Sequence, residues 1–424
     1  MQSKKAIMKL KLINKNQLGF GHLEILALLI VLSIISFGAW RVLSHKTKSY
    51  DSTATHSTIS TPAGFYVDAN KIIGPNGKQF VPYGTIIECA AQAKPVATLC
   101  QGKYLSGNTA YAQISAAAKY WNMNILRFQV AQEHLFNNNG SINYPYLNLI
   151  NSLVKQTNSL NMVAIITLQE EHYDGPAFPT STATAFWKFM AQHFKSYPDV
   201  FFDLYNEPRL PSNALLSDSN IWNIWQNGGD AYLSSGKTNG TTNQIVQYVG
   251  MQSLVNTIRQ QGAKNIIIAE GPYYDEDLSG LPTHTLTGGN IAYGIEPNLK
   301  NDTTQTSQYN TFGQYTKKWP IMPEAFLDNE GTQFCDPNSP ADLPKLLSYL
   351  KSLNMGLIFW ALVPGAGIIG TNLDQPTSYP TGTSSISSPM CPYKGPTSIY
   401  SLSSNTIGDG SLIMSYYKAN SVKL

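Results

Sequence analysis

Two glutamates in this 424-residue chain stand where a buried apolar run stops. Glu207 belongs to the stretch FFDLYNEPRLP at 201–211, and Glu324 belongs to KKWPIMPEAF at 317–326. Two carboxyl groups held side by side can act as a proton donor and a nucleophile. A solvated turn residue and a strand-end ion-pair partner are the alternative interpretation of the two glutamates.

The elements around these glutamates follow one repeated pattern. From residue 64 onward, short β-prone runs alternate with amphipathic stretches, which predicts successive βα units around a parallel sheet. Their Ile, Val, Leu and Phe residues are nearly continuous, as is typical of strands covered on both sides. The runs are 80–87, 124–130, 162–169, 200–208, 265–271, 291–297, 320–326 and 356–365, and helices are expected at 111–122, 146–160, 183–197, 244–262, 307–319, 342–353 and 412–422.

Eight such units predict an α/β fold of the (β/α)₈ TIM barrel type. An open doubly wound sheet is the rival fold, but the first run lacks the Gly-rich phosphate loop that this fold normally carries. In a barrel, catalytic side chains come from the C-terminal ends of the strands. Those ends hold Arg127, Gln129, Gln169, Glu170, Glu171, Asn206, Glu207, Glu270, Glu296, Asn298, Glu324 and Trp360.

Asn206-Glu207-Pro208 on the fourth run and Glu324 on the seventh resemble a motif pair of glycoside hydrolase family 5, the endoglucanase and mannanase group of retaining barrel enzymes. The resemblance covers residues 64–424 and implies that Glu207 is the acid/base and Glu324 the nucleophile. Retention requires the two carboxyl groups to lie about 5–5.5 Å apart. A neighbouring negative charge is expected to raise the pKa of Glu207.

The resemblance also assigns roles to three further residues. NILR at 124–127 matches the family's Asn-x-x-Arg, which implies that Arg127 holds Glu324 ionised. Asn206 is implied to contact the sugar 2-hydroxyl, and Trp360 to lie beneath a sugar ring, with a place in the barrel core as the alternative for Trp360. No cofactor or metal is required by this chemistry.

Two strand ends depart from the family pattern. The third run ends in Gln169 where the family usually has His, and His172 lies further along the loop. The sixth run carries Glu296 and Asn298 in place of His-x-Tyr, and alternation puts Tyr293 on the opposite face. We therefore expect Gln169, Glu296 and Asn298 to bind substrate and to alter its identity.

The N-terminal segment predicts a membrane anchor. Residues 25–40 carry no charge and five lysines precede them, so a single span with the following chain outside the cell is expected. A cleaved secretory signal is the alternative, but no A-x-A site follows the run. The predicted organisation is a basic leader at 1–19, a membrane helix at 20–44, a Ser/Thr-rich linker at 45–63 and a catalytic domain at 64–424.

The stretch LGFGHLEILALLIVL is similar to a type IV prepilin signal. This resemblance implies cleavage between Gly19 and Phe20 and places Glu24 five residues into the mature chain. In pilins such a glutamate is implied to pair with the amino terminus of a neighbouring subunit. Pilin-type subunits are therefore candidate partners.

Charge and cysteine content limit the remaining partners. The first 48 residues hold eight of the 29 basic residues and one acid, so the rest of the chain is acidic and offers no basic surface for nucleic acid. The four cysteines lack a close C-x-x-C pair, which argues against zinc. Two disulfides are expected, with all three pairings of Cys89, Cys100, Cys335 and Cys391 open.

Three functional hypotheses follow from these patterns. The leading one is a membrane-anchored extracellular glycosidase that cleaves a β-linked glucan, such as cellulose, or a mannan within the chain. The altered strand ends suggest a degenerate barrel that binds glycan as a surface adhesin without cutting it. The pilin-like start suggests a minor pilin subunit.

Overall fold

The computed structural model describes the chain from residue 64 onward, with gaps, and all described residues belong to the second of two compact units, Met1–Ser60 and Thr61–Leu424. The predicted leader, membrane helix and linker, including Gly19, Phe20 and Glu24, lie outside the described residues, as do all four cysteines. Within the described part, no helix is long and apolar enough to cross a bilayer. The described residues are 64–87, 110–171, 175–217, 220–234, 241–298, 312–326, 338–362, 368–370, 372–379, 381–382 and 408–424.

Eight parallel strands form the central sheet, and the sheet closes on itself. Their order is β11-β10-β9-β6-β5-β4-β3-β12, and a parallel bridge between Phe326 and Phe359 joins the two ends. The predicted (β/α)₈ barrel is confirmed, and each predicted strand is present. The strands are β3 (Tyr83–Ile86), β4 (Ile125–Ala131), β5 (Val163–Glu170), β6 (Val200–Asp203), β9 (Ile267–Glu270), β10 (Ile291–Ile295), β11 (Ile321–Pro323) and β12 (Leu357–Phe359).

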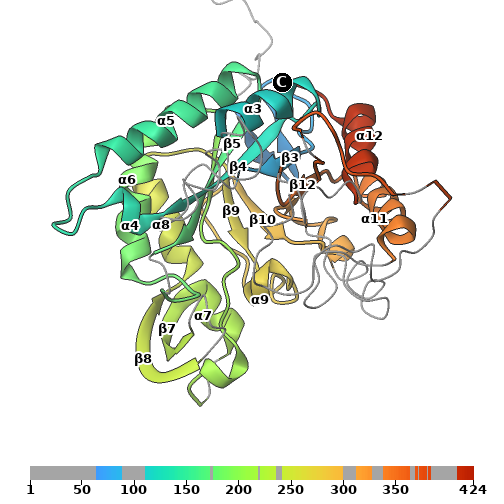
Figure 1. Cartoon of the computed structure of the whole chain (residues 1–424). Coiled ribbons are helices and arrows are strands. Elements are labelled where there is room, and N and C mark those ends of the chain that lie inside the picture. Colours follow the sequence, from blue (N-terminus) through green and yellow to red (C-terminus); the bar gives the residue numbers. More distant parts are fainter. Residues whose placement is uncertain are drawn as a thin grey trace, which may run out of the picture. The chain divides into compact units, whose positions relative to one another are not determined.

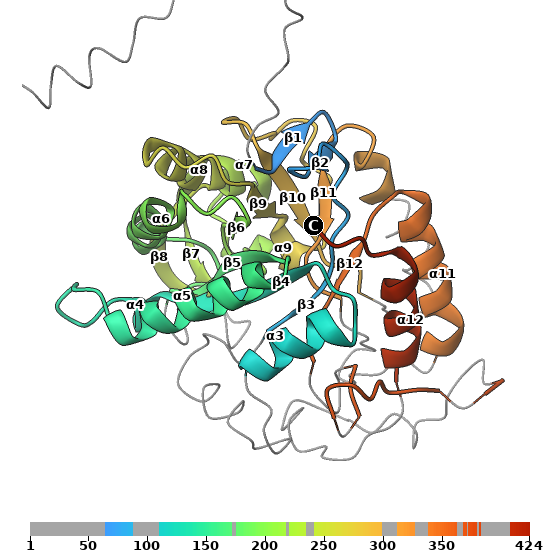
Figure 2. The same cartoon turned by 90° about the horizontal axis from the view of Figure 1, so that it is seen from above.

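Amphipathic helices surround these strands (Figure 2). The side chain of Asn143 caps α5 by accepting a hydrogen bond from the Tyr146 N–H, and Thr180 caps α6 in the same way. The short helix α4 (Gln132–Leu135) follows β4 directly. The long helices are α3 (Ala110–Lys119), α5 (Tyr144–Ser159), α6 (Ser181–Phe194), α8 (Met251–Gln260), α11 (Ser339–Ser352) and α12 (Gly410–Asn420).

The helix predicted at 244–262 is wrong over its first part. Residues up to Val249 belong to β8 (Thr241–Val249), which pairs antiparallel with β7 (Gly228–Ser234) after the short helix α7 (Ile221–Asn227). Pairing with the distant β7, favoured by the Thr, Ile and Val content of β8, overrides the local helical pattern. This hairpin lies beside α7 at the bottom of Figure 1. Of the helix predicted at 307–319, residues 307–311 lie outside the described part and 312–315 form a helical turn.

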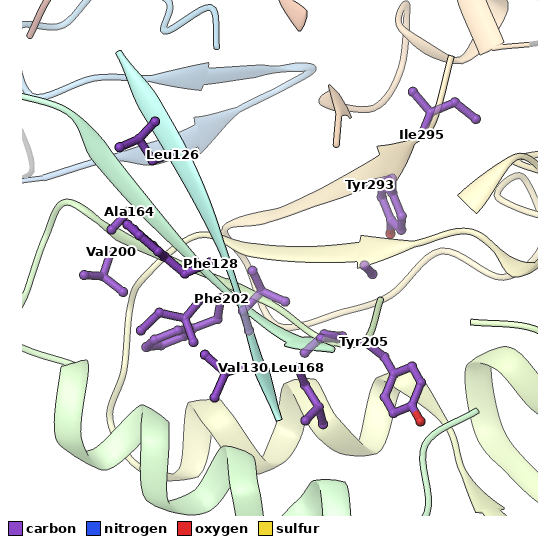
Figure 3. Packing of buried hydrophobic residues seen from close by; sticks show 14 of the residues in the cluster. Leu126, Phe128, Val130, Ala164, Leu168, Val200, Phe202, Tyr205, Tyr293 and Ile295 are labelled. Atoms are coloured by element: carbon purple, nitrogen blue, oxygen red, sulfur yellow. The ribbon is translucent and has the colours of Figure 1, made fainter. Parts of the chain in front are cut away.

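Alternating strand residues build two apolar layers. One set of side chains points outward and packs beneath the helices, and Figure 3 labels Leu126, Phe128, Val130 and Phe202 among its members. The other set fills the barrel lumen and includes Ile125, Val163, Ile165, Phe201, Ile268, Met322 and Ile358. The next inward positions along several strands are polar, so a polar layer covers the apolar lumen.

An N-terminal hairpin joins the apolar lumen core. The strands β1 (Tyr66–Asp68) and β2 (Lys71–Ile73) pair antiparallel. The Phe65 ring meets that of Phe201 edge to face, with centroids 5.0 Å apart, and Phe80 packs against both rings. Because Phe201 lies near the start of β6, the aromatic contact is at the end of the barrel opposite the predicted site.

Candidate active site

Arg127 is the centre of the polar layer above the lumen. Its fully buried guanidinium donates hydrogen bonds from Nε and Nη2 to Oδ2 of Asp203, at 3.1 and 2.7 Å. Nη2 also donates to Oε1 of Glu270, and Nε lies 3.2 Å from Oε2 of Glu324. Arg127 of β4 thus contacts acids at the ends of β6, β9 and β11.

The charges of this layer do not balance. Burial by itself would lower the pKa of Arg127, but Asp203, Glu270 and Glu324 together raise it. Burial raises the pKa of Glu324 well above its usual range, and Asp203 adds to this effect while Arg127 opposes it. Arg127 therefore acts on Glu324 in the expected direction, but one guanidinium is shared among three buried carboxyl groups, and its holding Glu324 ionised stays a prediction.

Glu207 occupies an irregular stretch beyond β6. Its φ of 42° is in the left-handed region, which is uncommon for a non-glycine residue, and its side chain reaches solvent. The Glu207 N–H donates to Oε2 of Glu270 at 2.5 Å. Desolvation by the surrounding protein raises the pKa of the Glu207 carboxyl, Arg127 opposes this, and Glu276 raises it further. The predicted effect of a neighbouring negative charge is thus present but secondary.

Asn206 lies beside Glu207 and is buried. Its N–H donates to the Leu168 carbonyl at 2.9 Å, and its Oδ1 accepts a hydrogen bond of 3.5 Å from Gln129. These contacts fix the residue to β4 and β5. Asn206 and Glu207 are therefore held by different neighbouring strands.

The end of β10 holds Glu296 and Asn298, both buried, with the Asn298 amide donating to Oε2 of Glu296 at 3.3 Å. Burial raises the pKa of Glu296 well above its usual range, and Glu207 adds to this effect, which places the two carboxyl groups within electrostatic reach. Tyr293 lies on the opposite face, where its hydroxyl accepts from the Leu286 N–H. The predicted orientation of Tyr293 is confirmed.

Two further predicted substrate residues lie near the rim of the barrel. Gln169 is half-buried at the end of β5, and its Oε1 has no hydrogen-bond partner within the described part of the chain. Trp360 is half-buried after β12 and packs against both apolar cores. Glu171, by contrast, is structural, since its carboxylate accepts hydrogen bonds from the N–H and the hydroxyl of Thr180 at the start of α6.

Sequence reasoning missed two buried acids of this layer, Asp203 and Asp275. Asp203 follows Phe201 by two positions on β6, so strand alternation already places its side chain in the lumen. Asp275 ends the short α9 (Pro272–Asp275), and no sequence signal points to it. Carboxylate oxygens of Asp203, Glu270 and Glu324 lie within 4.8 Å of one another, a spacing that could hold a metal ion, but Arg127 already supplies positive charge there.

A parallel barrel with carboxyl groups gathered at the ends of its strands has the architecture of a glycoside hydrolase. The chain belongs to glycosyl hydrolase family 5, because the family's Cellulase model matches residues 89–363. No curated protein matches the chain significantly.

Solved structures support the fold. A β-glucanase from Saccharophagus degradans, determined in complex with cellotetraose, is 19% identical with a TM-score of 0.55, over 78% of this chain and 94% of that one. The catalytic domain of an endoglucanase from Thermobifida fusca is 13% identical with a TM-score of 0.53, over 85% of this chain and all of its own. At these identities the likeness shows the fold alone.

Proposed function

We propose that the protein is a retaining endo-β-glycosidase in which Glu207 is the acid/base and Glu324 the nucleophile. One observation carries the assignment. Glu207 is joined through its N–H to Glu270, Glu270 accepts from Arg127, and Arg127 pairs with Glu324. The backbone of Glu207 and the carboxyl group of Glu324 are therefore linked through Glu270 and Arg127 at the ends of β6 and β11.

The reaction proceeds in two displacements. Glu324 attacks the anomeric carbon, and Glu207 gives its proton to the departing glycosidic oxygen. Glu207, now ionised, takes a proton from water, and the oxygen of that water displaces Glu324. The raised pKa of Glu207 suits the first step, since its carboxyl stays protonated at higher pH than an ordinary glutamate.

The neighbouring polar groups are proposed to bind the sugar. Asn206 would contact the 2-hydroxyl, and Trp360 would offer its flat ring to a sugar face. Gln169, Glu296 and Asn298 would meet the remaining hydroxyls. Family membership and the β-glucanase determined with cellotetraose support a β-linked glucan, such as cellulose, or a mannan as substrate.

Reducing-sugar release from cellulose, mixed-linkage β-glucan and mannan tests this proposal. Wild type is expected to release sugar from at least one polymer, while Glu324→Ala and Glu207→Ala lower the rate by several orders of magnitude. Glu133→Gln, a change at an exposed carboxylate, is the matched control. Release that survives Glu324→Ala contradicts the assignment. The anomer formed first, followed by NMR, reports retention, and the lengths of early products report endo cleavage.

A second candidate is a glycan-binding barrel that does not cut. Complete burial of Glu324 favours it, because a nucleophile must reach the anomeric carbon. This candidate predicts retention of the protein on a glucan or mannan affinity gel with no sugar released from any polymer. The same panel of polymers therefore separates the two functions.

We also propose that residues 1–63 anchor the protein in the cell membrane with the domain outside the cell, and that they begin with a prepilin-like leader. A minor pilin role depends on this leader. Mass spectrometry of the mature N-terminus tests it, because the proposal expects the chain to begin at Phe20. A mature chain that begins at any other residue contradicts the leader, and recovery of the protein in the soluble cell fraction contradicts the anchor.

A further inference from the structure

The turn after β9 has an unusual backbone. Tyr273, Tyr274 and Asp275 have φ values of 62°, 63° and 55°, so three consecutive non-glycine residues are left-handed. Left-handed residues normally occur singly, because Cβ approaches the next carbonyl oxygen. Such strain persists where the surroundings impose it, and it gathers at functional sites. The surrounding structure must therefore hold the turn in this conformation, and the strain suggests that the turn has a functional role.

Hydrogen bonds hold this turn in place. Oδ1 of Asp275 accepts from the Gly271 N–H at 2.8 Å, and the Asp275 carbonyl accepts from the Glu296 N–H at 2.7 Å. Arg209, which follows Glu207 by two positions, donates to the Tyr274 hydroxyl at 2.5 Å. The turn is thus fixed to the loops that carry Glu207 and Glu296.

The consequence is a buried acid beside the proposed nucleophile. Asp275 is fully buried, and its Oδ2 has no hydrogen-bond partner in the described part of the chain. A Cβ built on Gly294 would lie 2.8 Å from Oδ2 of Asp275 and 3.0 Å from Cγ of both Glu270 and Glu324. Because Gly294 has no side chain, Asp275 and Glu324 can both come close to its backbone, and there they approach each other.

Asp275 differs from the neighbouring buried acids in its ion pairing. Arg127 forms ion pairs with Asp203, Glu270 and Glu324, and among the described residues no ion pair involves Asp275. Neither oxygen of Glu324 accepts a hydrogen bond from a described residue. The acids Glu296, Glu324 and Asp203 act electrostatically on Asp275. Glu270 lies next to it at Gly294, and Arg127 is paired with the other acids of the cluster.

We propose that Asp275 is a neutral, protonated positioning residue whose O–H faces Glu324, orients the nucleophile and stabilises the carboxylate form in which Glu324 attacks. The inference rests on the proposed function and extends it to a residue outside the two catalytic carboxyls. A buried acid without a cation is most stable in its neutral form. Burial and the surrounding acids raise the pKa of Asp275 well above its usual range, which agrees with this state.

Asp275→Asn and Asp275→Ala test the proposal in the full chain. The amide of Asn is neutral, keeps an acceptor for the Gly271 N–H and can donate to Glu324. Asp275→Asn is therefore expected to retain kcat within about threefold, while Asp275→Ala lowers kcat on the order of 10- to 100-fold with little change in KM. Asp68→Asn, at an exposed position of β1, is the control.

The pH profile distinguishes positioning from mere structural support. In wild type, activity at high pH is expected to fall as Glu207 and Asp275 lose their protons. Asp275→Asn removes only the loss caused by Asp275, so its activity should fall less steeply at high pH than that of wild type. An Asn variant that folds yet is as inactive as the Ala variant overturns the proposal, since it would show that Asp275 acts as a carboxylate.

A spectroscopic measurement keeps the proposal testable if no substrate is cleaved. The infrared spectrum of wild type at pH 7 is expected to contain the C=O absorption of a protonated carboxylic acid, and part of it should be missing in Asp275→Asn. Wild type without any such absorption overturns the proposal even if both variants fail to fold. Failure of the polymer panel alone removes the proposed hydrolysis and leaves this measurement unaffected.

Discussion

The backbone N–H of Glu207 donates a hydrogen bond of 2.5 Å to Oε2 of Glu270, while Oε1 of Glu270 accepts from Arg127. Glu270 thereby ties the left-handed stretch that carries the proposed acid/base to the cation that pairs with Glu324. Glu270, which has no role of its own in the proposed reaction, thus links the two proposed catalytic residues, Glu207 and Glu324. Its role is testable separately from theirs.

Removal of the Glu270 side chain is expected to lower kcat more than removal of its charge alone. Glu270→Ala loses the hydrogen bond from the charged Arg127 guanidinium, which contributes about 1.5–3 kcal/mol, so we expect kcat to fall on the order of 10- to 100-fold. Glu270→Gln keeps one acceptor oxygen and should fall less. Steady-state kinetics on the best polymer measures both, with Glu133→Ala as control. A wild-type kcat in Glu270→Ala contradicts the proposed link.

Replacement of Arg127 is expected to destabilise the fold. Arg127→Met removes the cation and leaves Asp203, Glu270 and Glu324 buried without a compensating positive charge, which typically costs about 3–5 kcal/mol of unfolding free energy. The loss should grow with pH as more of the Glu270 and Glu324 carboxyls ionise. Chemical denaturation at pH 5 and pH 8 measures it.

Lys345 provides the matched control for Arg127. Its ammonium lies 2.8 Å from Oδ1 of Asp342 in an ion pair whose lysine side chain is 72% exposed. Lys345→Met should therefore change stability by no more than about 1 kcal/mol. Equal losses for the two variants contradict the view that Arg127 compensates buried charge.

Local sequence patterns predicted the barrel because parallel strands covered on both sides leave nearly continuous apolar runs. Alternation also placed Tyr293 on the outer face, and the irregular backbone at Glu207 agrees with a loop that turns Asn206 and Glu207 toward one substrate. The same alternation also places the side chain of Asp203 in the lumen, so this residue could have been predicted from the sequence.

Other features depend on contacts that a local pattern does not contain. The strand β8 forms because it pairs with β7, although its residues continue the helical spacing of α8. Asp275 enters the site only through a left-handed turn that residue propensities disfavour. The pKa of Glu324 depends on how many buried acids share Arg127, which follows from the packing of β6, β9 and β11.

A methyl group at Gly294 is expected to disturb the whole carboxyl cluster. The added Cβ would lie 2.8 Å from Oδ2 of Asp275, a distance that real Cβ atoms essentially never show, and 3.0 Å from two glutamate side chains, so these side chains would have to move. Gly294→Ala should lower the unfolding free energy by about 1–3 kcal/mol and reduce kcat. Gly74→Ala is the control, since its nearest contact would be 3.4 Å. Denaturant midpoints and kcat for both variants check the prediction, and an unchanged Gly294→Ala contradicts the packing.

Stability is expected to decrease as the pH rises above the ordinary range of carboxyl groups. Burial raises the pKa of Glu270, Asp275, Glu296 and Glu324 well above the ordinary values of 4.5 for Glu and 3.8 for Asp. Between the ordinary and the raised pKa, the folded protein binds more protons than the unfolded chain, so the unfolding free energy falls with increasing pH. The stabilisation is complete below about pH 4 and is lost as each group ionises in the folded state.

Chemical denaturation from pH 4 to pH 9 measures this slope in wild type and in Asp275→Asn. Because Asn cannot ionise, the variant should lose stability less steeply with pH, while Asp68→Asn, at an exposed position, should follow wild type. A wild-type stability that rises steadily from pH 5 to pH 8 contradicts the prediction, because it would mean that these buried carboxyls are ionised more easily in the folded protein than in the unfolded chain.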